Sequence, residues 1–262
     1  MNTETFFAVR GVNYRFPDGP LIFEDFSWQI RRGEAWSVLG PSGCGKTTLL
    51  YLLAGLLEPD RGEVLVEGRA LSRPRPRTGL IIQEYGLLPW ATVRENARLG
   101  LDIRGFYGPD GTHAPREILS TREVDPWLGR LEILAQAEKY PAQLSGGQRQ
   151  RTAIARTLVL QPDTLLMDEP FSSLDAPTRE ALQRLSLELQ RERELTTVLV
   201  THNIEEAAVM GEKILLLGQP PNRRAVVVEN PGGARPGFRG TETYYRICDR
   251  LRSALGSGED GL

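Results

Sequence analysis

The stretch GPSGCGKTT, at residues 40–48, constrains the fold of this chain more than any other. It matches the pattern G-x-x-x-x-G-K-[ST], in which a glycine-rich loop joins a buried strand to a helix. The required context is present: the apolar run AWSVL precedes the loop, and KTTLLYLLAGLL follows it with leucines at helical spacing. We therefore expect a strand, a phosphate-binding loop and a helix in immediate succession, rather than a purely structural glycine turn.

The chemistry expected of this loop follows from its residue types. Glycines let successive backbone N–H groups turn inward around phosphate oxygens, and the helix N-terminus adds partial positive charge. Lys46 is expected to reach the β- and γ-phosphates, and the Thr47 hydroxyl to take one Mg²⁺ position. Cys44 has no base beside it in the sequence, so we do not interpret it as a nucleophile. The residues expected to bind the nucleotide are Gly40, Pro41, Ser42, Gly43, Cys44, Gly45, Lys46, Thr47 and Thr48.

The rest of the chain indicates an α/β fold with a mainly parallel core sheet. Short apolar runs at residues 64–67, 80–83, 164–168, 197–201 and 213–217 predict buried strands. Helical patterns lie between the later runs, as at residues 178–193, and strand–helix alternation is typical of a parallel sheet covered on both faces. Residues 21–30 end in apolar–polar alternation, which predicts a half-buried, antiparallel strand in the N-terminal part.

Composition excludes several classes of function. The 262 residues carry a formal net charge of −2, which does not favour a nucleic-acid binder held by bulk electrostatics. The two cysteines, Cys44 and Cys248, are too few for a disulfide framework or a metal knuckle, so a reduced cytosolic setting is expected. No export signal is visible, and the longest apolar runs fall short of the ~20 residues that a membrane span needs. We expect a chain that does not cross a membrane.

Two adjacent acids close one of the predicted strands. The run LLMDEP places Asp168 and Glu169 at the carboxyl end of an apolar strand, where α/β proteins bind ligands. Asp168 suits the coordination shell of Mg²⁺. Glu169 would point to the other side of the strand and face the attacking water, as general base or orienting group. Without the phosphate loop, a solvated pair of acids would be the better interpretation.

A third motif, LSGGQRQR at residues 144–151, looks like an anion-binding turn but contains no nucleophile, metal ligand or base. Together with the two motifs above, it resembles the ATP-binding cassette (ABC) ATPases, over roughly residues 6–230. Residues 144–148 match the signature sequence of that family. The resemblance implies that Ser145, Gly146, Gly147 and Gln148 of one copy cap the γ-phosphate of ATP held by a second copy, which makes a two-fold homodimer with composite sites.

Further residues fall at positions to which the resemblance assigns roles. Gln83 would contact Mg²⁺ and the attacking water, and sense the membrane partner. Asp175 would cross the dimer interface, and His202 would touch the γ-phosphate. Phe16 is our choice for stacking on adenine, with Tyr14 as the alternative; His113 is given no role. The resulting catalytic set is Lys46, Gln83, Glu169 and His202, and the resulting metal set is Thr47, Gln83 and Asp168.

The resemblance also implies a domain organisation. A P-loop NTPase cassette would occupy residues 1–230, with a helical subdomain that carries the signature inserted at about residues 88–160. Residues 105–126 are irregular and begin rich in glycine and proline, as expected at the start of such a subdomain. Residues 231–262 would form an extension with one amphipathic helix and a frayed tail. Tyr244, Ile247, Cys248, Leu251 and Leu255 share one face of that helix.

Several classes of ABC ATPase are disfavoured by features that this sequence lacks. One phosphate loop, one signature, no heptad arm and no basic tail argue against the DNA-repair and translation relatives, and missing membrane spans argue against a fused exporter. The segment LLPWATVREN resembles the ATPases of nitrate, aliphatic sulfonate, taurine and bicarbonate importers. We expect an ATPase of that type, peripheral on the cytoplasmic face of the cell membrane, that serves a separate permease and, indirectly, a substrate-binding protein. Alternatives are an importer of another solute, an exporter of separate subunits, or a regulatory ATPase.

One exposed apolar stretch remains open to two interpretations. Leu87, Leu88 and Trp90 follow Gln83 closely and are too apolar for an ordinary solvated loop. They either pack under the helical subdomain or line a groove that receives a short helix of the permease.

Overall fold

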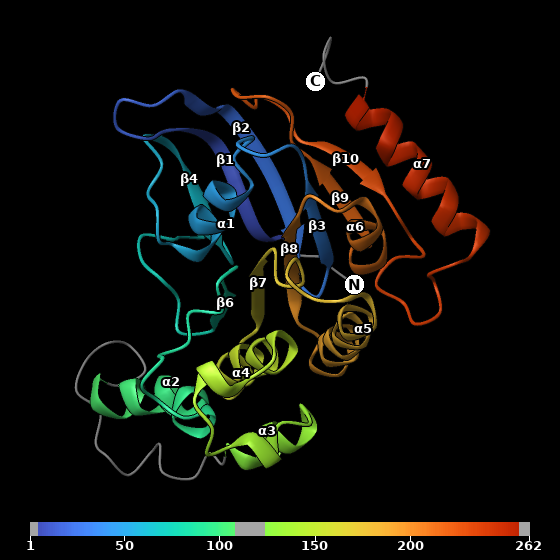
Figure 1. Cartoon of the computed structure of the whole chain (residues 1–262). Helices are drawn as coiled ribbons and strands as arrows, with labels where there is room; N and C mark the ends of the chain where they lie inside the picture. Colours follow the sequence, from blue (N-terminus) through green and yellow to red (C-terminus); the bar gives the residue numbers. More distant parts are fainter. Residues whose placement is uncertain (1–4, 108–123, 257–262) are drawn as a thin grey trace. The chain divides into compact units, whose positions relative to one another are not determined.

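The computed structural model describes residues 5–107 and 124–256, and Figure 1 shows its elements in chain order. The chain divides into two compact units. The first unit is Met1–Arg75, Leu166–Glu169 and Ser186–Leu262, and the second is Pro76–Leu165 and Pro170–Leu185. His113 and most of the segment at residues 105–126 lie outside the described residues.

The first unit contains a four-stranded antiparallel sheet with the order β2-β1-β4-β5. Its strands are β1 (Thr5–Arg15), β2 (Leu21–Arg31), β4 (Arg61–Val66) and β5 (Arg69–Ala70). The antiparallel strand predicted at residues 21–30 is confirmed, because β2 pairs antiparallel with β1 and buries Phe26, Trp28 and Ile30 on one side. The buried strand predicted at residues 64–67 is part of β4, which also pairs antiparallel with β1.

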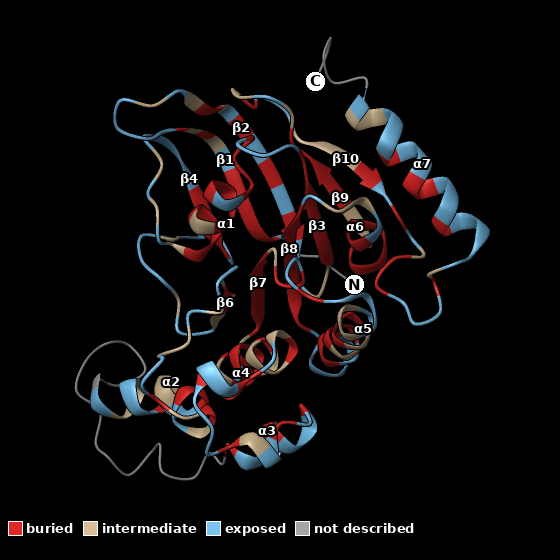
Figure 2. Cartoon of the chain, viewed as in Figure 1, coloured by how far each residue is buried: buried red, intermediate tan, exposed pale blue. Residues whose placement is uncertain are grey.

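The second sheet of the first unit has the order β10-β9-β3-β8-β7. These strands are β3 (Ala35–Leu39), β7 (Thr164–Asp168), β8 (Thr196–Thr201), β9 (Lys213–Leu216) and β10 (Val226–Glu229). β3 pairs in parallel with β8 and β9, and β10 pairs antiparallel with β9. Figure 2 shows β3 and β8 buried along their whole length, as expected for central strands of a covered parallel sheet. The predicted mainly parallel core is confirmed.

Helices of the first unit follow from the sequence pattern. α1 (Lys46–Ala54) begins at the end of the phosphate loop and stops at Gly55, whose left-handed backbone (φ 70°) closes the helix. α6 (Ile204–Met210) is capped by the side chain of Asn203, which accepts from the backbone N–H of Glu206. α7 (Glu242–Gly256) lies against α6 and buries one face, made of Tyr244, Ile247, Cys248 and Leu251.

The second unit is mostly helical. It contains β6 (Thr78–Ile81), which is next to β7 in the sheet order, together with α2 (Val93–Tyr107), α3 (Asp125–Arg130) and α4 (Gly146–Leu158). Two short 3₁₀ turns, Leu134–Gln136 and Pro141–Gln143, precede α4. α5 (Ala176–Arg193) begins in this unit and ends in the first. α4 packs against α2, α3 and β6.

Among the residues that the structure describes, none of the helices combines the length and the apolar character needed to cross a bilayer.

Candidate functional site

The phosphate loop lies between the end of β3 and the start of α1, as predicted. Gly45 is the N-cap of α1 and has φ 104°, a conformation that L side chains rarely adopt. A Cβ at Gly45 would lie 2.5 Å from Cγ2 of Ile22, and a Cβ at Gly40 would lie 2.5 Å from the carbonyl oxygen of Leu217. Both positions therefore require glycine for space, and Gly45 requires it for backbone conformation as well.

Lys46 folds its ammonium group back over this loop. Its Nζ donates to the carbonyl oxygens of Gly40 (2.9 Å) and Pro41 (2.8 Å), and the residue is only 7% exposed. Carbonyl groups are neutral acceptors, so these bonds position the positive charge without cancelling it. The loop thus holds a cation beside the N-terminus of a helix, where an anion is favoured.

Thr47 and Asp168 meet beside the loop. The Thr47 hydroxyl donates to the Asp168 carboxylate, at 2.9 Å from Oδ2 and 3.2 Å from Oδ1. Asp168 ends β7 and is buried. Burial is the largest cause that raises the pKa of its carboxyl group, and the negative charge of Glu169 raises it further. The hydrogen bond from Thr47 and the positive charge of Lys46 lower the pKa but do not outweigh these two effects. In the protein without nucleotide, the negative charge of this carboxylate is therefore not fully compensated by its surroundings.

Glu169 and His202 lie together at the ends of neighbouring strands. The backbone N–H of Glu169 donates to the carbonyl oxygen of Val200 (2.9 Å), which joins the end of β7 to β8. Nδ1 of His202, the residue after β8, lies 2.9 Å from Oε1 of Glu169. Glu169 has a left-handed backbone (φ 44°), which aims its side chain differently from that of a residue continuing the strand. The structure thus brings both predicted residues into direct contact.

The two aromatic candidates differ in exposure. Phe16 is 44% exposed, whereas Tyr14 is 6% exposed and places its ring edge-on against Phe16, with centroids 5.2 Å apart. Phe16 is therefore the more accessible of the two rings, and the buried Tyr14 ring packs against it.

The remaining predicted residues lie in the second unit. Ser145 caps α4: its oxygen accepts from the backbone N–H of Gln148, and the Gln148 side chain accepts from the backbone N–H of Ser145. Gly147 lies so close to Thr178 that a Cβ would come within 2.5 Å of Cγ2. Gln83 is exposed after β6, and Asp175 is exposed just before α5.

Two hydrogen bonds, one in each unit, form contacts that sequence reasoning does not select. The Tyr85 hydroxyl bonds to Oγ of Ser173, and so links the loop after Gln83 to the segment before Asp175. Asn222 donates to the carbonyl oxygen of Cys44 in the phosphate loop (2.8 Å) from a position 178 residues away. No local pattern signals such contacts, because only the folded chain brings the partners together.

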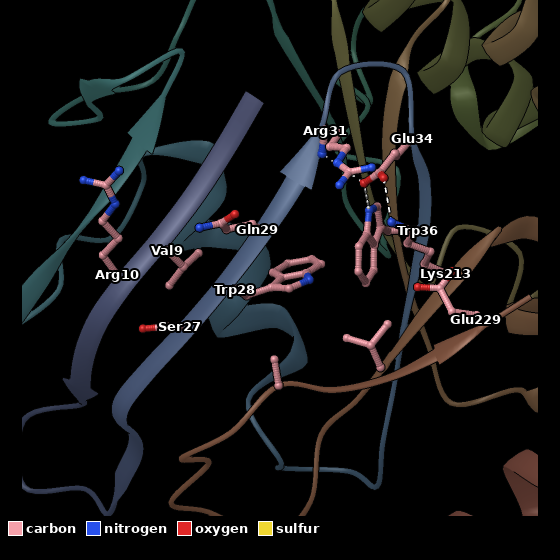
Figure 3. Close-up of a pocket in the computed structure, with 12 residues that line it drawn as sticks. Val9, Arg10, Ser27, Trp28, Gln29, Arg31, Glu34, Trp36, Lys213 and Glu229 are labelled. Carbon is pink, nitrogen blue, oxygen red and sulfur yellow. Dashed lines mark hydrogen bonds and ion pairs between the residues drawn. The ribbon is translucent and has the colours of Figure 1, made fainter. Parts of the chain in front are cut away.

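A pocket of about 550 Å³ also lies in the first unit, and Figure 3 shows its lining. It contains Trp36 from the start of β3, at the opposite end of that strand from the phosphate loop. Glu34 accepts from Trp36 Nε1 and Lys213 Nζ, each at 2.7 Å. Burial opposes ionisation of Glu34, but these bonds and one from the backbone N–H of Arg31 lower its pKa. Glu34 thus links Trp36 of β3 to Lys213 of β9, and the predicted site residues do not line this pocket.

The chain is similar in sequence to known proteins. Residues 23–172 match the sequence profile of the ABC transporter family. The chain is 42% identical over 239 residues to a taurine import ATP-binding protein of Pseudomonas aeruginosa, which covers 89% of the chain and 87% of that protein. It is 36% identical over 230 residues to an aliphatic sulfonates import ATP-binding protein of Bacillus cereus, covering 88% and 86%.

Solved structures show the same fold. An ATP-binding cassette solved as a dimer in a post-hydrolysis state with ADP and phosphate superposes with a TM-score of 0.71 at 30% identity, over 85% of this chain and 98% of that one. A component of an ABC transporter complex from Clostridium perfringens gives a TM-score of 0.73 at 26% identity, over 98% and 100%. The chain therefore belongs to the ABC transporter family, as one of its ATP-hydrolysing cassettes.

Proposed function

We propose that this chain is the ATPase subunit of an importer for a small anionic solute of the taurine and sulfonate type, coupled to a separate permease. The observation that carries the ATPase part is the grouping in one compact unit of the phosphate loop, Asp168 and the Glu169–His202 pair. The importer part is supported by the similarity to taurine and aliphatic sulfonates import proteins over most of the chain.

In this proposal the phosphate loop binds ATP through backbone N–H groups and Lys46. The ammonium group leaves the carbonyl oxygens of Gly40 and Pro41 and turns to the β- and γ-phosphates, where charge-assisted bonds are stronger than those to neutral carbonyls. Phe16 stacks on the adenine base. The other contacts come from Ser42, Gly43, Thr47 and Thr48, which belong to the loop or to the first turn of α1.

The residues beside the loop fit Mg²⁺. Within the part of the chain that the structure describes, no group of three or more His, Cys, Asp or Glu is placed to hold a metal. Mg²⁺ is commonly held by one or two carboxylates together with substrate phosphates, and the Thr47 hydroxyl and the buried Asp168 carboxylate are oxygen donors of that kind. When bound, Mg²⁺ neutralises charge that develops on the transferred phosphoryl group. Gln83 completes the proposed metal set.

Hydrolysis is assigned to Glu169 and His202. Glu169 orients the attacking water and takes up its proton, and no covalent intermediate is required. His202, in contact with Glu169 in the protein without nucleotide, fixes the direction of that carboxylate and would contact the γ-phosphate when ATP is present. Positioning and charge neutralisation together account for most of the rate enhancement in phosphoryl transfer.

The site is completed by a second copy of the chain. We propose a nucleotide-sandwich homodimer in which Ser145, Gly146, Gly147 and Gln148 of one protomer contact the γ-phosphate bound to its partner, and Asp175 crosses the interface. The cap of α4 supports this assignment: Ser145 uses its lone pair on the Gln148 N–H and keeps its own hydroxyl proton free to donate. A cassette of similar fold has been solved as a dimer with ADP and phosphate.

The subunit binds the cytoplasmic face of the cell membrane through permease subunits, and a substrate-binding protein delivers the solute to the permease. The cassette spans residues 1–230, with its helical subdomain at about residues 88–160 and an extension at residues 231–262. An importer of another small solute is the second candidate, since solute specificity would lie in the permease and the substrate-binding protein.

The test is to purify the chain with its permease in lipid and to measure ATP hydrolysis with one loaded substrate-binding protein at a time. Taurine, alkanesulfonates, nitrate and bicarbonate are the solutes to compare. Stimulation by one of these solutes, which all carry a sulfonate or another oxyanion group, supports the proposal. Equal rates with all four, together with stimulation by a solute that has no such group, would overturn the assignment of solute class and leave the ATPase intact.

A further inference from the structure

The segment after β9 lies directly against the phosphate loop. This segment, residues 217–222, is called the strap. The backbone N–H of Leu217 donates to the carbonyl oxygen of Leu39 (2.9 Å), the residue just before the loop. The Leu217 carbonyl oxygen occupies the space into which a Cβ on Gly40 would project, at 2.5 Å. The strap therefore begins in van der Waals contact with the first residue of the loop.

The strap ends at Asn222, which makes hydrogen bonds to three parts of the first unit. Its Nδ2 donates to the carbonyl oxygen of Cys44 (2.8 Å) and, at 3.4 Å, to that of Ile22. Its Oδ1 accepts from the backbone N–H of Gly218 (3.0 Å). Its backbone N–H donates to Ile22 (2.9 Å), and its carbonyl accepts from Glu24 (3.0 Å). One buried side chain thus joins the loop, the strap and β2.

The bond to Cys44 determines how one peptide group of the loop is oriented. A trans peptide is planar, and its C=O and N–H point in opposite directions. Because the Cys44 carbonyl points to Asn222, the N–H of Gly45 in the same peptide points away from it. Gly45 is the left-handed N-cap of α1 and immediately precedes Lys46, so its N–H belongs to the group of amides expected to face an anion.

We propose that Asn222 is a positioning residue for ATP binding, which holds the Cys44–Gly45 peptide in the orientation that the phosphates require. This rests on the proposed function of the loop. Without the side chain, the Cys44 carbonyl loses its donor, and the peptide has to be ordered when ATP binds. The free-energy cost of this ordering weakens ATP binding, whereas a site that is already rigid avoids the cost.

Asn230 provides a matched control in the same unit. Like Asn222 it is buried, and its Nδ2 donates to two backbone carbonyls, those of Ala208 (2.8 Å) and Gly211 (2.7 Å). These carbonyls belong to α6 and its C-cap, not to the phosphate loop. Asn222→Ala and Asn230→Ala should both lower the unfolding temperature, since each leaves buried carbonyl groups without a donor.

Only the first variant should change nucleotide binding. We expect the Kd for ATP, measured by titration well below both unfolding temperatures, to rise about tenfold in Asn222→Ala and to stay unchanged in Asn230→Ala. KM for ATP should rise in parallel, with kcat altered by less than about threefold, because lost ground-state binding is shared by the transition state. Equal changes in the two variants would overturn the positioning role.

Two further measurements distinguish a failure of the Asn222 proposal from a failure of the proposed function and from misfolding of the variant. Lys46→Ala should lose ATP affinity if the loop binds phosphate; unchanged affinity there contradicts the proposed function itself, whatever Asn222 does. In the unmodified protein, MgATP should slow amide hydrogen exchange at Gly218 and Asn222 more than at Asn230. If Asn222→Ala does not fold, this exchange experiment decides, and equal protection at the three amides counts against the proposal.

Discussion

At the scale of single residues, Asp168 is a carboxylate in a buried position with one hydroxyl donor, from Thr47. Burial raises the pKa of its carboxyl group above the value for an unfolded chain. A raised pKa means that the group's contribution to stability is fully present below the unfolded-state pKa and is lost as the pH rises through the folded-state pKa. At neutral pH the charge therefore destabilises the protein without nucleotide, and a cation at this position would offset it.

The first prediction follows from the destabilising effect of the ionised Asp168 carboxylate. Asp168→Asn keeps an acceptor for the Thr47 hydroxyl and removes the buried charge, so it should raise the unfolding temperature of the nucleotide-free protein by about 2 °C at pH 8. The gain should shrink as the pH is lowered toward the ordinary range for aspartate, about 4. Thermal unfolding of both proteins across this pH range is the measurement. A variant that is less stable than its parent at pH 8 would contradict the pKa argument.

The second prediction concerns Glu169. Glu169→Gln should bind MgATP yet hydrolyse it about 10²–10⁴ times more slowly, because the water loses its orienting carboxylate while the phosphate contacts survive. The trapped protein should accumulate as an ATP-dependent dimer, seen by size-exclusion chromatography. Glu194→Gln is the control, since Glu194 also has a left-handed backbone (φ 51°) and loses the same charge. Rapid turnover by Glu169→Gln would remove Glu169 from the proposed role.

At the scale of elements, the strands and helices that carry the loop could be predicted because their signals are local. Residues 164–168 match β7, and residues 35–39 match β3, since short apolar runs end sharply at polar or glycine residues. β1 and β10 are missing from the predictions, because their stability depends on pairing with β2 and β9 more than on their own pattern. The order of strands likewise depends on contacts that are distant in sequence.

In the candidate site too, residues with a local sequence signal could be predicted, and residues that act through distant contacts could not. Motif spacing selects Lys46, Asp168 and Glu169, and the fold then brings Glu169 to His202. Asn222 and the Tyr85–Ser173 contact are not selected, since an asparagine between two strands and a tyrosine in a turn are ordinary residues until their partners are known. The roles of the selected residues stay predictions until they are measured.

The third prediction belongs to the loop that precedes α2. Trp90 is 73% exposed, which argues against the interpretation that it packs under the helices of its own subunit. A large exposed aromatic side chain is typical of interface hot spots, where truncation often costs ~2 kcal/mol or more. Trp90→Ala should therefore leave folding and ATP binding nearly intact, and weaken assembly with the permease and solute-stimulated hydrolysis.

The control for this prediction is Leu56→Ala, which removes a 52% exposed apolar side chain from the first unit. Co-purification with the permease compares the two variants with the parent. Normal assembly and coupling of Trp90→Ala would place the docking surface elsewhere, and unfolding of this variant would restore the packing interpretation.

At the scale of the whole molecule, the proposed homodimer makes each ATP site depend on two protomers. Ser145→Arg places a large cation at the start of α4. It should inactivate the site in which that protomer contacts the ATP held by its partner, while its own phosphate loop can still bind ATP. Lys46→Ala spoils the phosphate loop of its own protomer. Each variant alone is expected to be inactive as a homodimer.

The fourth prediction is that mixing these two variants restores part of the hydrolysis. A mixed dimer places both substitutions in one composite site and leaves the other intact, so activity should appear that neither parent shows. Crosslinking of the mixed interface should accompany the assay, because cooperation between sites could hide the recovery. Absence of activity in confirmed mixed dimers would show that both sites are needed; activity in either parent would contradict the shared-site geometry.

The burial of both cysteines has a practical consequence for chemical labelling. Cys44 and Cys248 are the only thiols in the sequence, both are buried, and burial raises the pKa of each. A thiol reacts as its thiolate, so both should be slow toward maleimides and disulfide reagents at neutral pH. One cysteine introduced on the surface would then be the fast-reacting thiol of the molecule. Fluorescent or spin labels for following the ATP cycle can accordingly be attached without replacing either native cysteine.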